Sequence, residues 1–383
     1  MKATKLVIAT PIFPPESGGP GTYTCAIAEK LYPKYECVII TYSDAPSPLA
    51  HTRVIAIRKS QNLLFRWCKY TVALFRELRT ADIVYAQNAV ASGFPAVIAG
   101  MLLRKPVIIK MVGDEAWERA TAAGTTTKNI HDFLRAPEGG LKTKVFMAVQ
   151  RFALRRAMLV TTPSLYLLDE VTRAYSLSAN TTALNSNATE DIPLSSTPRH
   201  KYQIASVSRL VVWKHIDGLI RALTLVHKQF PDAVLKIAGV GPAENTLKKL
   251  VDELGVHKSV FFLGNLSTQD VRTLFSESEV YVLNSSYEGL PHTVLESFAA
   301  HTPVVATDIP GTNELVRHDT GFPIPVDNDI VLAETIASIF RDPSDAQKRA
   351  VDANAFFKRN FSWEHHVKIL EEFFTRATHS TKG

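Results

Sequence analysis

The sequence predicts an α/β protein built from two doubly wound domains. Short β-branched and apolar runs alternate with amphipathic stretches through almost all of the 383 residues. Such runs, separated by helices, are typical of parallel sheets that helices cover on both faces. The length agrees with two domains of roughly 100–200 residues each. With 46% apolar and 21% charged residues, the composition excludes a disordered or low-complexity chain.

The expected strands form two series, one in each half of the chain. In the first half they cover residues 5–13, 37–42, 53–57, 82–87, 106–112 and 159–163. In the second half they cover residues 202–207, 234–239, 260–263, 280–284 and 303–307. Each run has the length of a buried strand and is too short for an ordinary helix.

The segment 185–202 separates the two series. It is polar, contains two prolines and has no apolar period, so it predicts a linker. We therefore place one domain at residues 1–195 and the other at residues 196–360. A last helix is expected over residues 363–377, and its apolar stripe requires a surface to pack on.

Cysteine content and hydropathy indicate the cellular compartment of the protein. Cys25, Cys37 and Cys68 are odd in number and form no CxxC pair, which excludes a disulfide framework and favours a reducing compartment. The first nine residues hold too short an apolar run for a signal peptide, and no stretch approaches about 18 apolar residues. We therefore expect a cytoplasmic protein without a transmembrane segment.

Charge is divided unevenly between the halves. Residues 1–195 carry 23 basic and 15 acidic side chains, whereas residues 196–383 carry 20 and 22. A basic surplus in the first half suggests nucleic acid, an anionic membrane or a phosphorylated substrate. No zinc-ligand spacing, homeodomain-like segment or RNP pattern is visible, so nucleic acid is not expected.

Two basic amphipathic stretches, 63–79 and 141–158, account for much of this surplus. Each interleaves arginine and lysine with aromatic and aliphatic residues. Such a stretch can lie on an anionic membrane, here the inner face of the cytoplasmic membrane. A core helix with a solvated basic face is an equal alternative.

Loops that follow the strands of parallel sheets are the places to look for ligands. After the first strand, Gly18, Gly19 and Gly21 would let the backbone approach an anion at a helix start. The dinucleotide pattern GxGxxG is not met, because Thr24 takes the third glycine's place. A tight turn is the alternative interpretation.

Two loops of the second half contain charged residues just after a strand, where they could contact a ligand. Arg209 and Lys214 follow the strand that ends at residue 207, where two cations could neutralise a diphosphate. Glu288 precedes a glycine turn, and Glu296 falls in the helix that Pro291 suits as a start. A carboxylate there can accept hydrogen bonds from a ribose diol. Solvated surface cations and a capping acid are the alternatives.

These segments resemble the retaining GT-B glycosyltransferases of glycosyltransferase family 4. Glu288 and Glu296 reproduce the family's E-x7-E motif within EGLPHTVLES, and Arg209 and Lys214 reproduce its R-x4-K pair within SRLVVWKHIDGLI. The turn AGVGP, which contains Gly241, is similar to the family's GxGP turn.

Three further segments match in family order. Gly18 and Gly19 match a double glycine after the first strand. TDIPGTNE (307–314) resembles T-x3-G-x2-E, with proline where a second glycine is common, and FSWE (361–364) is similar to the closing FSW segment. The resemblance covers nearly the whole chain. It implies two Rossmann-like domains facing a central cleft, with residues 361–383 returning to the first, acceptor-binding domain.

The resemblance implies sugar transfer from a nucleotide-sugar, with retention of anomeric configuration. Glu296 would hold the nucleotide ribose and Glu288 the hydroxyls of the donor sugar. Arg209 and Lys214 would stabilise the departing diphosphate, so no metal or other cofactor is expected. The resemblance also assigns donor contacts to Gly18, Gly19, Gly241, Gly289, Leu290, Pro291, His292 and Thr293.

The sequence departs from the family pattern at two places. His215 stands where glycine often follows the family lysine, and the loop after the strand 106–112 lacks the histidine that many members have there. Asp114, with Glu115 second, is our candidate for a sugar or acceptor contact in that loop. A helix cap by Asp114 is the alternative. The DxD pattern at 327–329 is expected to be a surface turn.

The expected function is a retaining, metal-independent glycosyltransferase of glycoconjugate or polysaccharide biosynthesis. Its acceptor would be a glycan, a lipid-linked sugar or a glycolipid. Front-face attack, with the leaving phosphate taking the acceptor's proton, suits a sequence in which no loop supplies a second carboxylate nucleophile. The alternatives are a non-catalytic partner subunit of the same fold and a nucleotide-sugar 2-epimerase.

Overall fold

The computed structural model describes residues 3–16, 19–193 and 198–380. The chain forms two compact units. The first unit contains Met1–Asn185 and Val367–Gly383, and the second contains Ser186–His366. Each unit is a parallel sheet with helices on both faces, so the predicted α/β class is confirmed.

The first unit has a seven-stranded sheet in the order β3-β2-β1-β4-β5-β6-β7, parallel throughout. Its strands are β1 (Thr4–Thr10), β2 (Tyr35–Tyr42), β3 (Arg53–Ile57), β4 (Ile83–Gln87), β5 (Val107–Lys110), β6 (Leu159–Thr162) and β7 (Thr182–Leu184). The order reverses between β1 and β4. A doubly wound sheet binds ligands at such a switch point, beyond the carboxyl ends of its strands.

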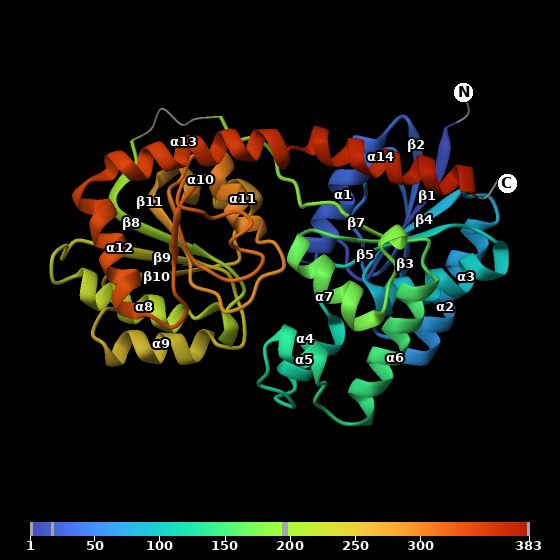
Figure 1. Cartoon of the computed structure of the whole chain (residues 1–383), viewed down its shortest axis with the longest axis horizontal. Coiled ribbons are helices and arrows are strands. Elements are labelled where there is room, and N and C mark those ends of the chain that lie inside the picture. The colour runs from blue at the N-terminus through green and yellow to red at the C-terminus, as the bar shows by residue number, and fades with distance from the viewer. Residues whose placement is uncertain (1–2, 17–18, 194–197, 381–383) are drawn as a thin grey trace. The chain divides into compact units, whose positions relative to one another are not determined.

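Helices cover both faces of this sheet. They are α1 (Gly19–Leu31), α2 (Leu63–Leu78), α3 (Phe94–Leu103), α4 (Glu115–Ala122), α5 (Ile130–Arg135), α6 (Leu141–Arg156), α7 (Leu165–Tyr175) and the last helix α14 (Trp363–Ser380), with short turns η1 (Ala89–Gly93) and η2 (Ala179–Thr181). Figure 1 shows α1 and α14 on one side of the sheet and α2, α3 and α6 on the other.

The predicted last helix is confirmed, and its apolar stripe packs on the first unit. Phe374 is fully buried, with its ring 5.5 Å from that of Tyr35 on β2 and 5.7 Å from that of Tyr85 on β4. Leu370 is buried on the same stripe. The end of the chain is thereby fixed to the sheet formed by its beginning.

The second unit has a six-stranded parallel sheet in the order β10-β9-β8-β11-β12-β13. Its strands are β8 (His200–Val207), β9 (Val234–Ala238), β10 (Val260–Gly264), β11 (Ser278–Leu283), β12 (Val304–Thr307) and β13 (Phe322–Ile324). Its helices are η3 (Val212–Lys214), α8 (Ile216–Val226), α9 (Glu244–Glu253), α10 (Thr268–Glu277), α11 (His292–Ala299), α12 (Asp329–Arg341) and α13 (Pro343–Asn360).

Two apolar layers hold this sheet. One joins the sheet to α8, α9 and α12, through residues such as Leu219, Val251 and Ile336. The other joins it to α10, α11 and α13, through residues such as Phe275, Phe298 and Phe357. The sheet order reverses between β8 and β11, so the loops after these two strands flank the unit's switch point.

The boundaries between the units differ from the predicted ones. The division falls at Asn185, before the predicted 195, and at His366, after the predicted 360. Ser186 O accepts a hydrogen bond from His366 Nδ1 at 2.7 Å, and Asn187 Nδ2 donates one to Leu290 O at 3.0 Å. The polar segment therefore attaches to the second unit from its start.

The sequence missed β7 and β13. Both have only three residues, too few for any apolar period, and both lie at the edge of a sheet. β13 contains Pro323, which an edge strand tolerates because proline cannot donate to a ladder.

Candidate functional site

The two loops that carry the predicted charges meet at the switch point of the second unit. One follows β8 and includes Arg209 and Lys214, and the other follows β11 and includes Glu288. Several hydrogen bonds join them; among these, Ser286 N donates to Trp213 O at 2.9 Å, and Asn284 Nδ2 donates to His215 O at 3.0 Å. The loops therefore form one structure at the carboxyl edge of the sheet.

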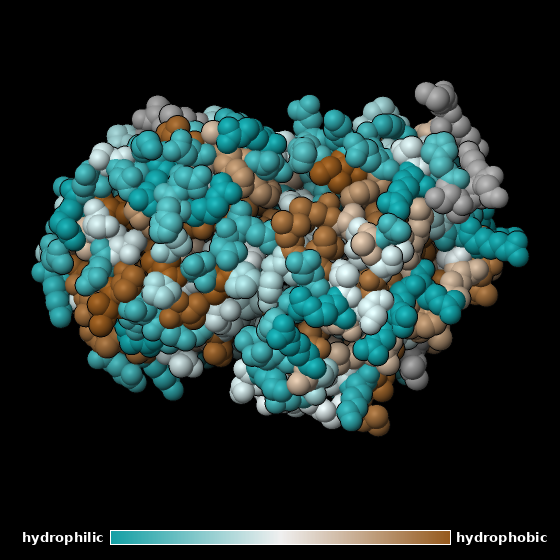
Figure 2. Space-filling view, in the orientation of Figure 1, coloured by the Kyte–Doolittle hydropathy of each residue, from teal (hydrophilic) through white to brown (hydrophobic). Residues whose placement is uncertain are grey.

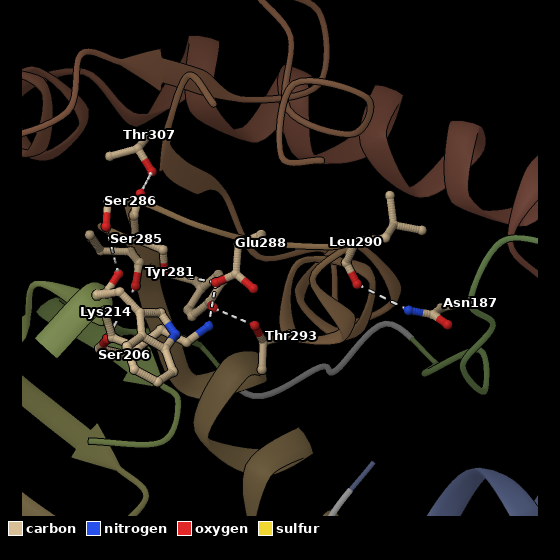
Figure 3. Close-up of polar contacts among 12 residues, drawn as sticks. Asn187, Ser206, Lys214, Tyr281, Ser285, Ser286, Glu288, Leu290, Thr293 and Thr307 are labelled. Atoms are coloured by element: carbon tan, nitrogen blue, oxygen red, sulfur yellow. Dashed lines mark hydrogen bonds and ion pairs between the residues drawn. The ribbon is translucent and has the colours of Figure 1, made fainter. Parts of the chain in front are cut away.

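Lys214 and Glu288 form an ion pair at the centre of this structure. Figure 3 shows the Lys214 ammonium directed at the Glu288 carboxylate, where Nζ contacts Oε1. The side chains are only 14% and 11% exposed. Ser285 Oγ donates to the same carboxylate oxygen at 2.7 Å. Removing either partner would leave the other group largely buried and unpaired, which is costly.

Arg209 supplies the second cation of the β8 loop. Its side chain is exposed, and its guanidinium lies 5.9 Å from the centre of the Trp213 ring. Lys214 is thus held inside the loop structure while Arg209 faces solvent. Together they place two positive charges at the strand end, an arrangement suited to an anionic ligand.

The β11 loop ends at the start of α11. Pro291 occupies the N-cap and has no side-chain capping bond, and the first turn contains no acid. Amides at a helix start favour anions, and here no side chain of Pro291 competes for them. Thr293 Oγ1 accepts from Tyr281 OH at 2.6 Å, as Figure 3 shows, which ties the first turn to β11.

Glu296 is the fifth residue of α11, eight residues after Glu288 in the preceding loop. Burial raises the pKa of its carboxyl from 4.5 to about 7, with Arg272 opposing the shift. The pKa of Tyr281 is raised well above its usual value, first by burial and then by Glu288 and Glu296. The Tyr281 hydroxyl is therefore close enough to both carboxylates to sense their charge.

Two glycines allow neighbouring loops to approach these residues. A Cβ on Gly241 would lie 2.3 Å from Leu210 O, in the loop that carries Arg209. A Cβ on Gly311 would lie 2.4 Å from Glu288 O, and Gly311 has a left-handed φ of +86°. The GxGP turn and the TDIPG segment are thus packed against the two charged loops, and only glycine fits.

The other residues predicted to contact the nucleotide-sugar donor follow Glu288 in the same loop and in the first turn of α11. Leu290 and Pro291 are buried, whereas Gly289, His292 and Thr293 are partly exposed. The Leu290 carbonyl accepts from Asn187 Nδ2, as Figure 3 shows. Sequence reasoning missed Asn187, Tyr281 and Ser285 as residues that position this loop, since no spacing rule connects them to it.

The double glycine after the first strand belongs to the first unit. Gly18 lies outside the described residues. Gly19 is exposed at the first position of α1, and a Cβ there would meet nothing within 4 Å. The chain itself therefore does not require glycine at this position.

Asp114 is a helix cap inside the first unit, as the alternative interpretation predicted. It is fully buried, and Oδ1 accepts from Trp117 N at 2.9 Å at the start of α4. Oδ2 accepts from Gln150 and Tyr175, each at 2.5 Å. Because these donors occupy both oxygens, the expected sugar or acceptor contact gains no support from the geometry.

Glu115 has a different environment. It is 9% exposed and lines a cavity of the first unit. Its Oε1 accepts two hydrogen bonds from Arg119, at 2.8 and 2.6 Å, whereas its Oε2 is buried without a partner. Of the two predicted acidic residues in this loop, only Glu115 keeps an oxygen available.

The DxD pattern forms a turn before α12. Asp327 is exposed and lies 3.1 Å from His215 Nδ1, and Asp329 accepts from Arg221 Nε at 2.6 Å. Across residues 3–16, 19–193 and 198–380, no group of three or more His, Cys, Asp or Glu side chains could hold a metal ion.

The two basic stretches fold as α2 and α6, and both expose apolar side chains. Phe65 and Val72 on α2 are about half exposed, as is Val145 on α6, and Leu141 is 79% exposed. Figure 2 shows a mostly hydrophilic surface interrupted by apolar patches. Among the helices that the structure describes, none is long and apolar enough to cross a bilayer.

The fold and the site together define the class of protein. Two parallel doubly wound units are the architecture of a GT-B protein. Comparison with solved structures agrees: HepE of Anabaena, crystallised with UDP, matches with a TM-score of 0.76. That match covers 97% of this chain and 100% of HepE, at 18% identity.

Family models identify the chain more closely. The model for glycosyl transferases group 1 matches residues 188–355, and the glycosyl transferase 4-like domain matches residues 18–188. The chain belongs to the glycosyl transferases group 1 family.

Curated relatives match over part of their length. An uncharacterised glycosyltransferase of Haemophilus influenzae is 32% identical over 172 residues, 44% of this chain and 47% of that protein. A GDP-mannose-dependent monoacylated α-(1-6)-phosphatidylinositol monomannoside mannosyltransferase of Corynebacterium glutamicum is 32% identical over 168 residues, 42% of this chain and 44% of that protein. The chain thus spans less than half the length of these two relatives.

Proposed function

We propose that the protein transfers a glycosyl group from a nucleotide-sugar to an acceptor, with retention of anomeric configuration and without a divalent metal ion. The observation that carries the proposal is the pairing of Lys214 with Glu288 beside Arg209, at the switch point of the second unit. HepE was crystallised with UDP and with UDP-glucose, which supports a nucleotide-sugar as the donor.

Each charged residue has a role that its environment supports. Arg209 and Lys214 would bind the donor diphosphate and stabilise the negative charge that develops as it leaves. Glu288 would accept hydrogen bonds from the donor sugar and orient Lys214 through their ion pair. Glu296 would accept hydrogen bonds from the ribose hydroxyls. The first amides of α11 would meet phosphate or sugar oxygens.

The acceptor side of the proposal involves the first unit. We propose that it binds a glycan, a lipid-linked sugar or a glycolipid, in glycoconjugate or polysaccharide biosynthesis. The mannosyltransferase of C. glutamicum is named for a phosphatidylinositol mannoside, a glycolipid of this kind. The exposed apolar residues on basic helices α2 and α6 support a cytoplasmic protein that associates peripherally with an anionic membrane.

A donor screen tests the proposal. The chain is incubated with UDP-, GDP- and ADP-sugars, with and without EDTA, and nucleoside diphosphate release is measured. Release from at least one donor, unaffected by EDTA, is the expected result. Water takes the sugar in this assay, so NMR must read the anomeric configuration before the released sugar mutarotates. Loss of activity with EDTA contradicts metal independence. Binding of no nucleotide favours a non-catalytic partner subunit, and formation of an epimerised sugar favours a 2-epimerase.

Membrane association has a separate test. In liposome flotation, the protein should float with vesicles that contain anionic lipid and stay behind with neutral ones. Flotation that is indifferent to lipid charge contradicts the membrane proposal but leaves the proposed transfer reaction unaffected.

A further inference from the structure

A cavity of about 560 Å³ lies within the first unit, at the carboxyl edge of its sheet. Its lining comes from the residues that follow β1, β3 and β4, from the end of β2, and from α2, α4 and α6. The cavity therefore occupies the switch point between β1 and β4, where doubly wound sheets bind ligands. Its volume is in the range of sites for small molecules.

The walls of this cavity are mainly apolar and are held in place by neighbouring rings. Eight of its twelve lining residues are apolar or aromatic, among them Tyr42, Trp67 and Phe146. The Trp67 ring stacks 4.9 Å from that of Phe94, and the Tyr42 ring stacks on a tyrosine of α2 at 4.4 Å. Such rigid aromatic walls suit the apolar chain of a ligand.

One cation of the cavity has no acidic partner. Lys59 pairs with Glu16, and Arg119 pairs with Glu115. No ion pair of Arg66 occurs among the described residues. Arg66 Nη1 donates to the Lys59 carbonyl at 3.1 Å, and Arg66 Nε is buried without a partner. The guanidinium matches the oxygens of a phosphate in geometry and charge.

The cavity is also lined by an acid, Glu115, which offers a hydrogen-bond acceptor where Arg66 offers a positive charge. Glu115 Oε2 is buried without a partner, although Glu115 Oε1 accepts two hydrogen bonds from Arg119. A buried acceptor that is left unsatisfied destabilises the structure, so a ligand that supplies a hydroxyl to it would be bound more tightly. The cavity thus lacks two partners: an anion for Arg66 and a hydroxyl donor for Glu115.

We propose that this cavity binds an acceptor lipid that carries a phosphate. The apolar chain would lie against Trp67 and Phe146, the phosphate would meet Arg66, and a hydroxyl would donate to Glu115. Val145 of the lining is half exposed on α6, and Phe65, the neighbour of Arg66 on α2, is half exposed too, so a lipid would meet apolar surface on both helices as it enters. The assignment of this lipid as the acceptor rests on the proposed transfer reaction, whereas the binding site itself does not.

Calorimetry with the full chain tests this inference without any nucleotide-sugar. The probe is farnesyl phosphate below its micellar concentration, compared with farnesol and with inorganic phosphate. The wild type should bind farnesyl phosphate more tightly than it binds farnesol or inorganic phosphate. Arg66→Gln should weaken farnesyl phosphate binding at least tenfold and leave farnesol binding unchanged, because one charge-assisted hydrogen bond is lost.

Lys69→Gln is the matched control. Lys69 is exposed on the same helix, above the Phe65 ring, and does not line the cavity, so this variant should bind as the wild type does. Val145→Trp, at a half-exposed position of the lining, should weaken binding of both farnesyl compounds. No binding to the wild type, or equal losses in Arg66→Gln and Lys69→Gln, overturns the inference.

Two further results assign the source of the lipid and separate this inference from the proposed function. Dihexanoyl phosphatidic acid replaces farnesyl phosphate in a parallel titration. Tighter binding of one or the other assigns a glycerolipid or an isoprenoid acceptor, and either result supports the inference. Because donor turnover is measured separately, its absence refutes the transfer reaction while leaving the lipid site intact, and absence of lipid binding refutes only the site.

Discussion

Glu296→Gln tests whether the proposed donor site keeps a partly buried carboxylate at the expense of stability. Burial raises the pKa of Glu296 from 4.5 to about 7. An acid whose pKa is higher in the folded state destabilises the fold once it ionises. The loss begins near pH 4.5 and is complete above pH 7. One pKa unit corresponds to 1.36 kcal/mol, so the cost at pH 8 is about 3 kcal/mol, against about 1 kcal/mol at pH 5.

Urea unfolding measures this cost. Glutamine keeps the shape of the side chain and cannot ionise, so Glu296→Gln should raise the free energy of unfolding at pH 8 by about 3 kcal/mol, and by about 1 kcal/mol or less at pH 5. Glu253→Gln, at an exposed position of α9, is the control and should change little at either pH. An equal effect of Glu296→Gln at both pH values would refute the assigned pKa.

The same carboxyl predicts a pH dependence of nucleotide binding. If ionised Glu296 accepts hydrogen bonds from the ribose, then binding weakens as pH falls below about 7. Between pH 8 and pH 6 the ionised fraction drops about tenfold, and the dissociation constant of the nucleoside diphosphate should rise by the same factor. Calorimetry should show this dependence in the wild type and not in Glu296→Gln.

Four other variants test separate parts of the structure. Lys214→Ala should lower turnover at least about 100-fold while changing the KM for the donor less, because the lost cation acts on the leaving phosphate; steady-state kinetics would show it. Gly311→Ala should weaken nucleotide binding, because the new Cβ would lie 2.4 Å from Glu288 O and would push that carbonyl away; calorimetry measures the loss. Phe374→Ala should destabilise the first unit by about 3–5 kcal/mol, which thermal unfolding would detect. Lys110→Met should stabilise the chain by up to about 4 kcal/mol at pH 7, and less toward pH 10, because burial lowers the pKa of Lys110 from 10.5 to about 7.

Each of these predictions has a contradicting result. Turnover by Lys214→Ala at the wild-type rate would show that Lys214 takes no part in the reaction. Unchanged nucleotide binding in Gly311→Ala would show that the TDIPG segment does not shape the Glu288 loop. A small effect of Phe374→Ala would mean that α14 is not held through this ring. A stabilisation by Lys110→Met that does not decrease toward pH 10 would contradict the low pKa of the lysine.

Much of the fold could be predicted because buried parallel strands carry a local signal. β3 was predicted with its exact bounds, and every strand of four or more residues was found within a few residues. The three-residue strands β7 and β13 escaped because their pairing depends on neighbours distant in sequence. The start of the second unit was placed too late, since Asn187 is attached by a hydrogen bond to Leu290.

The site could be predicted only in part. The charged residues and their loops follow from position after a strand, but the pairing of Lys214 with Glu288 joins residues far apart in the chain. Asp114 and Glu115 are adjacent and equally acidic in the sequence, yet one is a fully bonded cap and the other keeps a free oxygen. That difference arises from the side chains of α6 and α7 that surround Asp114.

Donor turnover by Lys214→Ala is the most direct test of the central claim, that the switch point of the second unit is a metal-independent nucleotide-sugar site. Nucleoside diphosphate release is measured in EDTA for the wild type, for Lys214→Ala and for Lys248→Ala, whose lysine pairs with Glu244 on the surface of α9. We expect release by the wild type and by Lys248→Ala, and a loss of at least about 100-fold in Lys214→Ala. Equal release by all three proteins would contradict it.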